Sequence, residues 1–243
     1  MVTNKYSNVS VAMTVYNGEK YLKSQINSII SQLNENDELV ISYDKSTDNT
    51  KEILNSYKYE KKVKVIEGPC TGVIDNFYNA VVNCSNDYIF LSDQDDVWIN
   101  GKIKTVLARF KETNADLIIH DAIITDENLE ILHKSFFIKR KCRKGIMKNI
   151  LKNSYIGCCM AFKNDIKKFI LPFPKNIPMH DQWIGILCEK YGKVEFLNKP
   201  LLYYRRHRSN VSSDKSENVF KMLCWRMKII KEFLNKILYE KNF

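Results

Sequence analysis

The sequence lacks the paired cysteines of zinc fingers and contains few histidines. It also has no apolar run long enough to cross a membrane. Its seven cysteines are scattered, none forms a Cys-x-x-Cys pair, and there are only four histidines. The missing cysteine pairs exclude the common zinc-finger spacings and predict reduced thiols, as in a cytosolic protein. A membrane-spanning helix needs about 18 consecutive apolar residues, which this chain lacks. The polar N-terminus, residues 1–8, does not have the pattern of a signal peptide.

Acidic residues are also scarce, with 28 Asp and Glu against 38 Lys and Arg, so the formal net charge is +10. This charge is compatible with nucleic acid, an anionic membrane surface or anionic substrates as partners. The basic residues crowd two segments, 134–152 and 221–241, whereas an acidic cluster lies between Ser92 and Trp98. The aromatic and basic interleaving of an RNA-binding sheet is not present, so we expect no nucleic-acid partner.

The length of 243 residues suits one α/β domain with a short appendage. Strand-like segments in the first half cover residues 9–16, 38–43, 63–66 and 88–91. Helical periodicity falls between them, over residues 19–33, from 46 onward and over 73–82. Such alternation predicts βαβ units and a mostly parallel sheet flanked by helices. The second half is less regular, with expected strands at 116–120, 154–162 and 201–205, a helix at 181–191 and an amphipathic helix at 216–242.

Three carboxylates, Asp93, Asp95 and Asp96, follow the apolar segment 88–91 directly. Like charges this close repel, and burying each costs roughly several kcal/mol unless a cation offsets it. A divalent cation with oxygen ligands is the simplest such cation, and it commonly leaves positions open for substrate phosphates. The alternative is a solvated acidic turn that caps a helix starting near Asn100. These residues alone favour neither the cation site nor the helix-capping turn.

Polar residues also follow the earlier strands, at Tyr16, Asn17 and Asp44. Ligands of parallel sheets bind beyond the carboxyl ends of the strands. We therefore expect these side chains and Asp93 to Asp95 to meet in one cleft.

Six segments resemble, in order, the motifs of a known family. They are Val-Ala-Met-Thr-Val-Tyr-Asn-Gly (11–18), Ser-Tyr-Asp-Lys-Ser-Thr-Asp-Asn-Thr (42–50), Gly-Val-Ile-Asp-Asn-Phe (72–77), Leu-Ser-Asp-Gln-Asp-Asp-Val-Trp (91–98), His-Asp-Gln-Trp (180–183) and Tyr-Arg-Arg-His-Arg-Ser-Asn (204–210). Together they resemble glycosyltransferase family 2, in its bacterial polysaccharide and rhamnosyltransferase-like branch. Tyr43 and Lys45 depart from the second motif, where the family has an acid and a glycine.

The resemblance implies the GT-A fold, a Rossmann-like mixed sheet flanked by helices. Residues 1–215 would form this domain, with a nucleotide-sugar half over about 1–100 and an acceptor half over about 101–215. Residues 216–243 would add a basic amphipathic helical segment.

The resemblance also implies an inverting, metal-dependent transfer of a sugar from a UDP-hexose or dTDP-rhamnose donor. The acceptor would be a glycan or a lipid-linked glycan in surface polysaccharide synthesis. Asp181 would be the general base, against the alternative of a helix-capping aspartate. The metal, Mg²⁺ or Mn²⁺, would be held by Asp95, Asp93 and His207. The nucleotide sugar would contact Thr14, Tyr16, Asn17, Asp44, Gly72, Asn76, Asp93 and Arg205.

Other interpretations stay open from the sequence. His120-Asp121 and His180-Asp181 invite a metal-dependent phosphohydrolase, and the sheet also suits a nucleotidyltransferase, although no glycine- and arginine-rich phosphate loop is present. The C-terminal stripe of apolar residues between lysines predicts a helix that binds an anionic membrane, packs on the domain or pairs with a second copy. The expected location is the cytoplasm, with peripheral attachment to the inner face of the cell membrane.

Overall fold

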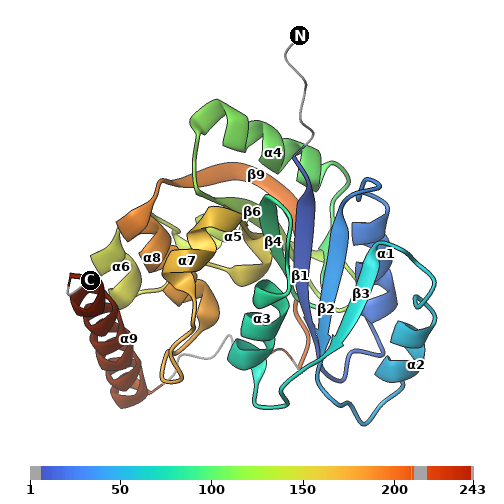
Figure 1. The fold of residues 1–243 in the computed structure, drawn as a ribbon, viewed down its shortest axis with the longest axis horizontal. Coiled ribbons are helices and arrows are strands. Elements are labelled where there is room, and N and C mark those ends of the chain that lie inside the picture. Colours follow the sequence, from blue (N-terminus) through green and yellow to red (C-terminus); the bar gives the residue numbers. More distant parts are fainter. Residues whose placement is uncertain (1–6, 209, 211–217, 242–243) are drawn as a thin grey trace.

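The computed structural model describes residues 7–208, 210 and 218–241, in which one nine-stranded sheet is flanked by helices (Figure 1). The N-terminal half consists of β1 (Val9–Val15), α1 (Leu22–Ile30), β2 (Glu38–Tyr43), α2 (Thr50–Asn55), β3 (Val63–Glu67), α3 (Val73–Val82) and β4 (Tyr88–Ser92). All pairings among these strands are parallel. Every residue of β1 is buried, as expected for a parallel strand covered on both faces. The predicted βαβ alternation is confirmed.

The C-terminal half is less regular. It consists of β5 (Val97–Trp98), α4 (Lys102–Thr113), β6 (Leu117–Thr125), β7 (Ile131–His133), α5 (Phe136–Arg140), α6 (Ile146–Leu151), β8 (Met160–Lys163), α7 (Lys167–Ile170), α8 (His180–Tyr191), β9 (Val194–Arg205) and α9 (Val219–Lys241). Two short 3-10 turns, Gly157–Cys159 and Asn164–Ile166, flank β8.

The strands stand in the order β3-β2-β1-β4-β8-β6-β9-β5, and β7 pairs with β6 outside this row. β8 is antiparallel to both β4 and β6, whereas β6 and β9 are parallel to each other. The sheet is therefore mixed and mostly parallel, and the predicted fold class is confirmed. β8 joins the parallel N-terminal half to the second half, so that both contribute side chains to one region beyond β4.

Three details of the predicted second half were wrong. The strand expected over 154–162 is β8 alone, because residues 157–159 turn through a 3-10 helix first. The strands β6 and β9 run longer than the expected 116–120 and 201–205, because they pair with each other along most of their length. The helix expected near Asn100 begins at Lys102, and β5 separates it from Asp96, so Asp96 does not cap it.

The C-terminal helix α9 lies at the edge of the molecule beside α6 (Figure 1). The predicted boundary between residues 215 and 216 lies outside the described residues. No described helix combines the length and the apolar character that a transmembrane span requires.

Candidate active site

The backbone after β1 is held by the side chain of Gln94, from the loop after β4. Gln94 Oε1 accepts a hydrogen bond from the Tyr16 N–H (2.9 Å), and Gln94 Nε2 donates to the Tyr16 carbonyl (2.8 Å). Tyr16 thus occupies a fixed position while its side chain stays exposed. Thr14, two residues earlier in β1, is buried. These contacts bring the first predicted turn against the acidic loop, as expected from adjacent parallel strands.

Asn17 connects the β1–α1 loop to the β2–α2 loop. Its Oδ1 accepts a hydrogen bond from the Thr47 N–H (2.9 Å), and its own N–H donates to Ser46 Oγ (2.9 Å). Asn17 has a φ of 48°, in the left-handed region that asparagine tolerates better than most residues. The second motif therefore uses its small polar side chains to hold two loops together, in spite of Lys45 standing in place of the family's glycine.

A group of hydrogen-bond acceptors lies beyond β2. Asp44 is buried, and its Oδ1 accepts a hydrogen bond from the Cys70 N–H (2.8 Å). Asn76, in α3, is 2% exposed, and its Oδ1 has no hydrogen-bond partner among the described residues. Both oxygens crowd Gly68, where an added Cβ would lie 2.2 Å from Asp44 Oδ1 and 2.8 Å from Asn76 Oδ1. An unpartnered acceptor of this kind suits an N–H donor of a bound ligand.

Gly72 lies directly before α3 and shapes the start of this helix. Its carbonyl accepts a hydrogen bond from the Asn76 N–H (3.0 Å), which closes the first helical turn. The residue has a φ of 114°. Asp44 and Asn76 thus lie together beside Gly68, and Gly72 joins them through its hydrogen bond from Asn76; their predicted contacts with a nucleotide sugar stay predictions.

The acidic loop carries carboxylates of different burial. Asp93 and Asp95 are half-buried, whereas Asp96 is fully buried. Burial, followed by the charges of Asp95 and Asp181, raises the pKa of Asp93 to about 7. Burial, followed by the charges of Asp95 and Asp93, raises the pKa of Asp96 well above its ordinary value. The loop is therefore short of positive charge, as the sequence predicted.

Residues after β9 contact this loop directly. His207 Nε2 lies 2.8 Å from Asp95 Oδ2, and Asn210 Nδ2 donates to the same oxygen (3.0 Å). The Asn210 side chain also accepts a hydrogen bond from the His207 N–H (2.7 Å), so the pair forms one unit. The predicted partners His207 and Asp95 are thus together, although 112 residues separate them.

Arg205, at the end of β9, donates hydrogen bonds to three other residues of the protein. Its N–H donates to Asp96 Oδ1 (3.0 Å), its Nε donates to the Asp95 carbonyl (2.7 Å), and its Nη1 donates to the Glu127 carbonyl. The guanidinium also stands 4.5 Å from the centre of the Tyr21 ring. Arg205 therefore orients the acidic loop, and its predicted contact with the nucleotide sugar stays a prediction.

Among the described residues, one group of side chains is close enough together to hold a metal ion. The ligand atoms of Asp93, Asp96 and Cys158 lie within 4.8 Å of one another. Burial raises the pKa of the Cys158 thiol well above its ordinary value, which keeps it protonated. Hard divalent cations prefer oxygen ligands, so the two carboxylates suit such a cation better than the thiol does. The predicted ligands Asp93, Asp95 and His207 do not form a group of this kind, and their role stays a prediction. Asp96 Oδ2 is buried without a hydrogen-bond partner in the described residues, which fits a nearby cation.

Lys102 is a buried cation that the sequence did not reveal. Its Nζ donates to the Cys158 carbonyl (2.9 Å) and lies 4.0 Å from the centre of the Trp98 ring. Burial lowers the pKa of Lys102 to about 8, while the neighbouring cysteines and Asp96 oppose that shift. Lys102 therefore offsets part of the negative charge from within the protein.

Asp181 lies in the first turn of α8 and is not its N-cap, which is Met179. Its Oδ1 accepts hydrogen bonds from the Gln182 N–H and from Asn153 Nδ2 (3.1 Å). Burial raises the pKa of Asp181 to about 6, and the hydrogen bonds, including one from the Gly157 backbone, limit this rise. The carboxyl is 9% exposed. A carboxylate of this kind is ionised at neutral pH and still basic enough to accept a proton.

His180, next to Asp181, has a structural role. Its ring stacks on Phe77 of α3 with 3.9 Å between the ring centres. Burial lowers the pKa of His180 to about 3, so the ring is neutral. A Cβ at Gly157 would lie 2.8 Å from His180 Nε2, so only glycine fits beside the ring. Trp183 also belongs to the core, and its indole N–H donates to the Ile170 carbonyl (2.8 Å).

The Asp121 carboxylate is held by three hydrogen bonds. Its Oδ1 accepts hydrogen bonds from the backbone N–H groups of Ala122 (2.8 Å) and Phe137 (2.9 Å), and its Oδ2 accepts one from Ser135 Oγ. The neighbouring His120 is fully buried in β6. Among the described residues, neither His120 nor His180 belongs to a group of potential metal ligands, which weakens the phosphohydrolase alternative.

Several supporting residues were missed. Gln25 of α1 donates from Nε2 to Ser92 Oγ (2.9 Å) and to the Asp93 carbonyl (3.0 Å), which fixes the end of β4. Gln94 belongs to the acidic motif at residues 91–98, but the motif predicts no role for it. Asn153 lies in none of the six motifs. The spacing of Gln25 among the apolar positions of α1 was the only indication that it faces inward.

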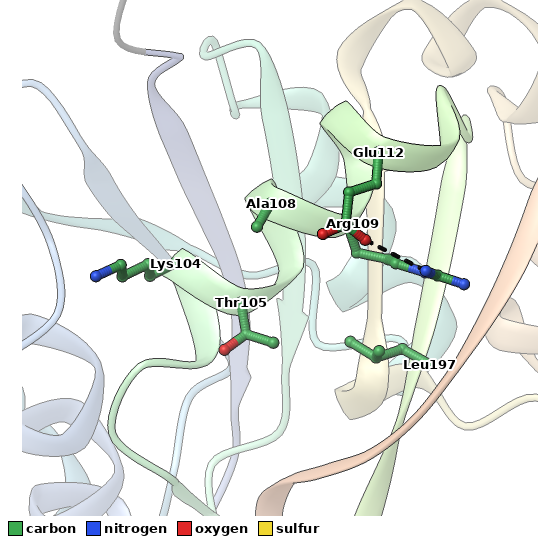
Figure 2. Close-up of a pocket in the computed structure, with 6 residues that line it drawn as sticks. All are labelled: Lys104, Thr105, Ala108, Arg109, Glu112 and Leu197. Carbon is green, nitrogen blue, oxygen red and sulfur yellow. Dashed lines mark hydrogen bonds and ion pairs between the residues drawn. The ribbon is translucent and has the colours of Figure 1, made fainter.

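A shallow hollow elsewhere takes no part in this site. Figure 2 shows it between the outer side of α4 and Leu197, with Arg109 and Glu112 pointing toward one another as an ion pair. None of its lining residues is a candidate site residue.

The model of Glycosyl transferase family 2 matches residues 10–170, which is more than half of the chain, and the chain belongs to this family. An uncharacterized glycosyltransferase of Nostoc is 25% identical over 83% of this chain and 66% of its own length. The Escherichia coli enzyme WfaP, named UDP-Glc:alpha-D-GlcNAc-diphosphoundecaprenol beta-1,3-glucosyltransferase, is 26% identical over 92% of this chain and 85% of its length.

Solved structures show the same fold. The S. aureus TarS 1-349 structure in complex with UDP-GlcNAc has a TM-score of 0.70 at 20% identity, covering 94% of this chain and 72% of that chain. The mannosyltransferase PcManGT from Pyrobaculum calidifontis, in complex with GDP-Man and Mn²⁺, has a TM-score of 0.58 at 15% identity over 79% of this chain and 54% of that chain. The predicted family and GT-A fold are confirmed. The chain spans just under two thirds (66%) of the Nostoc relative.

Proposed function

We propose that this protein transfers a sugar from a nucleoside-diphosphate sugar to a hydroxyl group of a glycan or lipid-linked glycan, with inversion at the anomeric carbon. The observation that carries the proposal is the position of Asp181. A Cβ at Gly157 would lie 3.7 Å from the Asp181 Cβ, and the next residue, Cys158, has its ligand atom within 4.8 Å of those of Asp93 and Asp96. One site thus holds both a base that is ionised at neutral pH and carboxylates suited to a cation. An inverting transfer needs this combination of groups.

The donor nucleotide would bind beyond β1 and β2. The unpartnered Asn76 Oδ1 and the buried Asp44 present acceptors to the N–H groups of a base. Thr14, Tyr16, Asn17 and Gly72 complete the predicted contacts. Asp93 would accept from the ribose.

The divalent cation, Mg²⁺ or Mn²⁺, would be held by Asp95, Asp93 and His207. When bound, it neutralises the charge that develops on the leaving diphosphate. The fit rests on three crowded carboxylates and on the unpartnered Asp96 Oδ2. Arg205 contributes by holding the Asp95 carbonyl and Asp96 Oδ1 in place.

Asp181 would accept the proton of the acceptor hydroxyl as its oxygen attacks the anomeric carbon. The new C–O bond forms as the bond to the diphosphate breaks, and the diphosphate leaves with the bonding electron pair. Attack from the opposite face inverts the anomeric centre. Asn153 and the Gln182 N–H hold Asp181 Oδ1 and so fix the orientation of the carboxylate that would take the proton.

The donor class is proposed as a UDP-hexose, with dTDP-rhamnose as the alternative. The UDP-GlcNAc complex of TarS and the UDP-Glc named for WfaP support the former. The acceptor named for WfaP is a diphosphoundecaprenol-linked sugar, which supports a lipid-linked acceptor in surface polysaccharide synthesis. We place the reaction on the cytoplasmic side of the cell membrane.

Ligand-dependent stability tests the donor proposal. The purified chain is heated with UDP, dTDP or GDP, each with and without Mn²⁺. A ligand present at about 100 times its dissociation constant adds about 2.7 kcal/mol to the free energy of unfolding, so one nucleotide with Mn²⁺ should raise the melting temperature by several degrees. Donor sugars of that nucleotide are then scored by nucleotide release and by the mass of the product. If no nucleotide stabilises the chain and DNA does, the transferase proposal is wrong.

A further inference from the structure

Helix α9 packs against the rest of the protein through one face. Ile229 is fully buried, and Arg226 Nε donates to the Leu151 carbonyl at the end of α6 (3.0 Å). Figure 1 shows α9 beside α6 and far from β3. One face of α9 is therefore used for packing, and the rest of its surface is open in the described structure.

The open surface of α9 includes a continuous apolar stripe. Six large apolar residues recur at intervals of three or four, which places them on one face of a helix. Their exposed fractions are 74% for Phe220, 48% for Leu223, 71% for Met227, 37% for Ile230, 51% for Leu234 and 59% for Leu238. At 1.5 Å per residue the stripe is about 27 Å long. Apolar patches of this extent on a soluble surface mark an interaction site.

Helix α6, which contacts α9, belongs to segment 134–152, and this segment has exposed apolar residues of its own. Ile138, Met147 and Leu151 are 80%, 65% and 56% exposed. The segment contains eight basic residues and no acidic one. Because α6 contacts α9 through Leu151 and Arg226, apolar side chains and basic charge meet on neighbouring helices.

The charge of the surface decides which partner it fits. Segments 134–152 and 219–241 together contain fourteen basic residues and two acidic ones. The three- and four-residue spacing also suits pairing with a second α9. However, such pairing would bring together Arg226 and Lys231, which flank the stripe, and like charges there oppose it. An anionic lipid surface accepts both the apolar stripe and the surrounding lysines.

The surface adjoins the candidate base. Asn149, in α6, accepts a hydrogen bond at its carbonyl from Gln182 Nε2 (2.8 Å), and Asn153 just after α6 donates to Asp181. One short segment therefore links the apolar and basic surface to the acceptor side of the site.

We propose that α9 and α6 form a docking surface for an anionic bilayer, with the α9 stripe in the interface and the surrounding lysines against lipid phosphates. Docking would hold the Asp181 side of the site next to the membrane, where a lipid-linked acceptor is found. The significance for the acceptor rests on the proposed function, whereas the binding itself does not.

Vesicle flotation of the full chain tests the surface without sugar or nucleotide. Vesicles contain phosphatidylglycerol and phosphatidylcholine in equal parts, or phosphatidylcholine alone. Binding is expected only to the anionic vesicles, and it should weaken as salt rises. Met227→Ser with Leu234→Ser, and separately Lys228→Glu with Lys231→Glu, should each lower the partition coefficient by at least about tenfold. All four residues are exposed, so the fold should be unaffected.

The matched control is Tyr59→Ser with Lys61→Glu, an exposed apolar and basic pair between α2 and β3. This control should bind vesicles as the parent does. The proposal is wrong if the parent does not float, or if both α9 variants float as well as the parent. Light scattering is measured in parallel. A dimer that only the Met227→Ser and Leu234→Ser variant loses would assign the stripe to a second copy and overturn the membrane assignment.

The test separates this proposal from the proposed function. Nucleotide-dependent stabilisation should be the same in the α9 variants and the parent, because α9 contributes no residue to the donor site. Flotation without nucleotide binding would support the docking surface and refute the proposed transferase function. Nucleotide binding without flotation would refute the docking surface and support the transferase function.

Discussion

Asp181→Asn is the most informative single substitution in the candidate site. The amide oxygen of asparagine can keep the acceptor position of Asp181 Oδ1, which binds the Gln182 N–H and Asn153 Nδ2. The substitution removes the ability to take up a proton and leaves the shape nearly unchanged. Because a general base contributes about 10²–10⁴-fold, kcat for sugar transfer should fall by that factor. The KM for the donor should stay close to the parent value.

The same change should stabilise the fold. Burial of the carboxyl raises the pKa of Asp181 from its ordinary value of 3.8 to about 6 in the folded protein. A raised pKa means that ionisation is unfavourable in the folded state, and each unit corresponds to about 1.4 kcal/mol. The penalty is absent below pH 3.8 and complete above about pH 6. At neutral pH, Asp181→Asn should therefore raise the free energy of unfolding by up to about 3 kcal/mol, and the gain should shrink as the pH falls toward 4.

The assay combines a pH profile of transfer with chemical denaturation at pH 7.5 and pH 4.5. Parental activity should fall as the pH drops through about 6, since protonated Asp181 cannot act as a base. Asn153→Ala is the matched control, because it removes a hydrogen bond that lowers the pKa of Asp181 and should move this acid limb to higher pH. Transfer by Asp181→Asn at the parental rate, or a loss of stability at pH 7.5, would refute the reasoning.

Further expectations concern the acidic loop and its supports. Asp95→Ala should abolish turnover and leave the melting temperature near the parental value, because it removes a repelling carboxylate; full activity of the parent in excess EDTA would argue against an essential metal. Gln94→Ala removes two hydrogen bonds to the Tyr16 backbone, worth about 1 kcal/mol each, and should raise the donor KM by about tenfold, as measured by initial rates. Gly157→Ala should lower the melting temperature by several degrees in calorimetry, since its Cβ would lie 2.8 Å from His180 Nε2; an unchanged value would mean that the His180 ring is free to move.

The parallel half of the fold was predictable because its strands are continuous apolar segments separated by periodic helices. The second half was harder. β9 contains Pro200, which interrupts a strand pattern, and the structure accommodates it at a register shift opposite His120 and Asp121. Residues 154–159 are mostly apolar but do not extend as a strand, because Gly157 turns the chain tightly against His180. Neither the strand through Pro200 nor the turn at Gly157 can be predicted without knowing which segment packs against it.

The candidate site divides in the same way. Asp44, Asp95, His207 and Asp181 belong to motifs, and the structure places the His207 ring on Asp95 and the charge of Asp181 near Asp93. Their assigned roles stay predictions. Lys102 looks like an ordinary lysine at the start of a helix, and only the packing of α4 against the segment that contains Cys158 makes it a buried cation. A tertiary contact of this kind leaves no periodic signal in the sequence.

The end of β9 shows why the acidic motif alone does not define the site. Arg205 reaches both the Asp96 side chain and the Asp95 carbonyl, and His207 and Asn210 reach Asp95 Oδ2. These contacts span more than a hundred residues of sequence, and they depend on the pairing of β9 with β6 and β5. The same three carboxylates in a solvated turn would repel one another and spread apart. The pairing of β9 therefore argues against a solvated acidic turn, because it holds the carboxylates together against their repulsion, and the divalent cation stays a prediction.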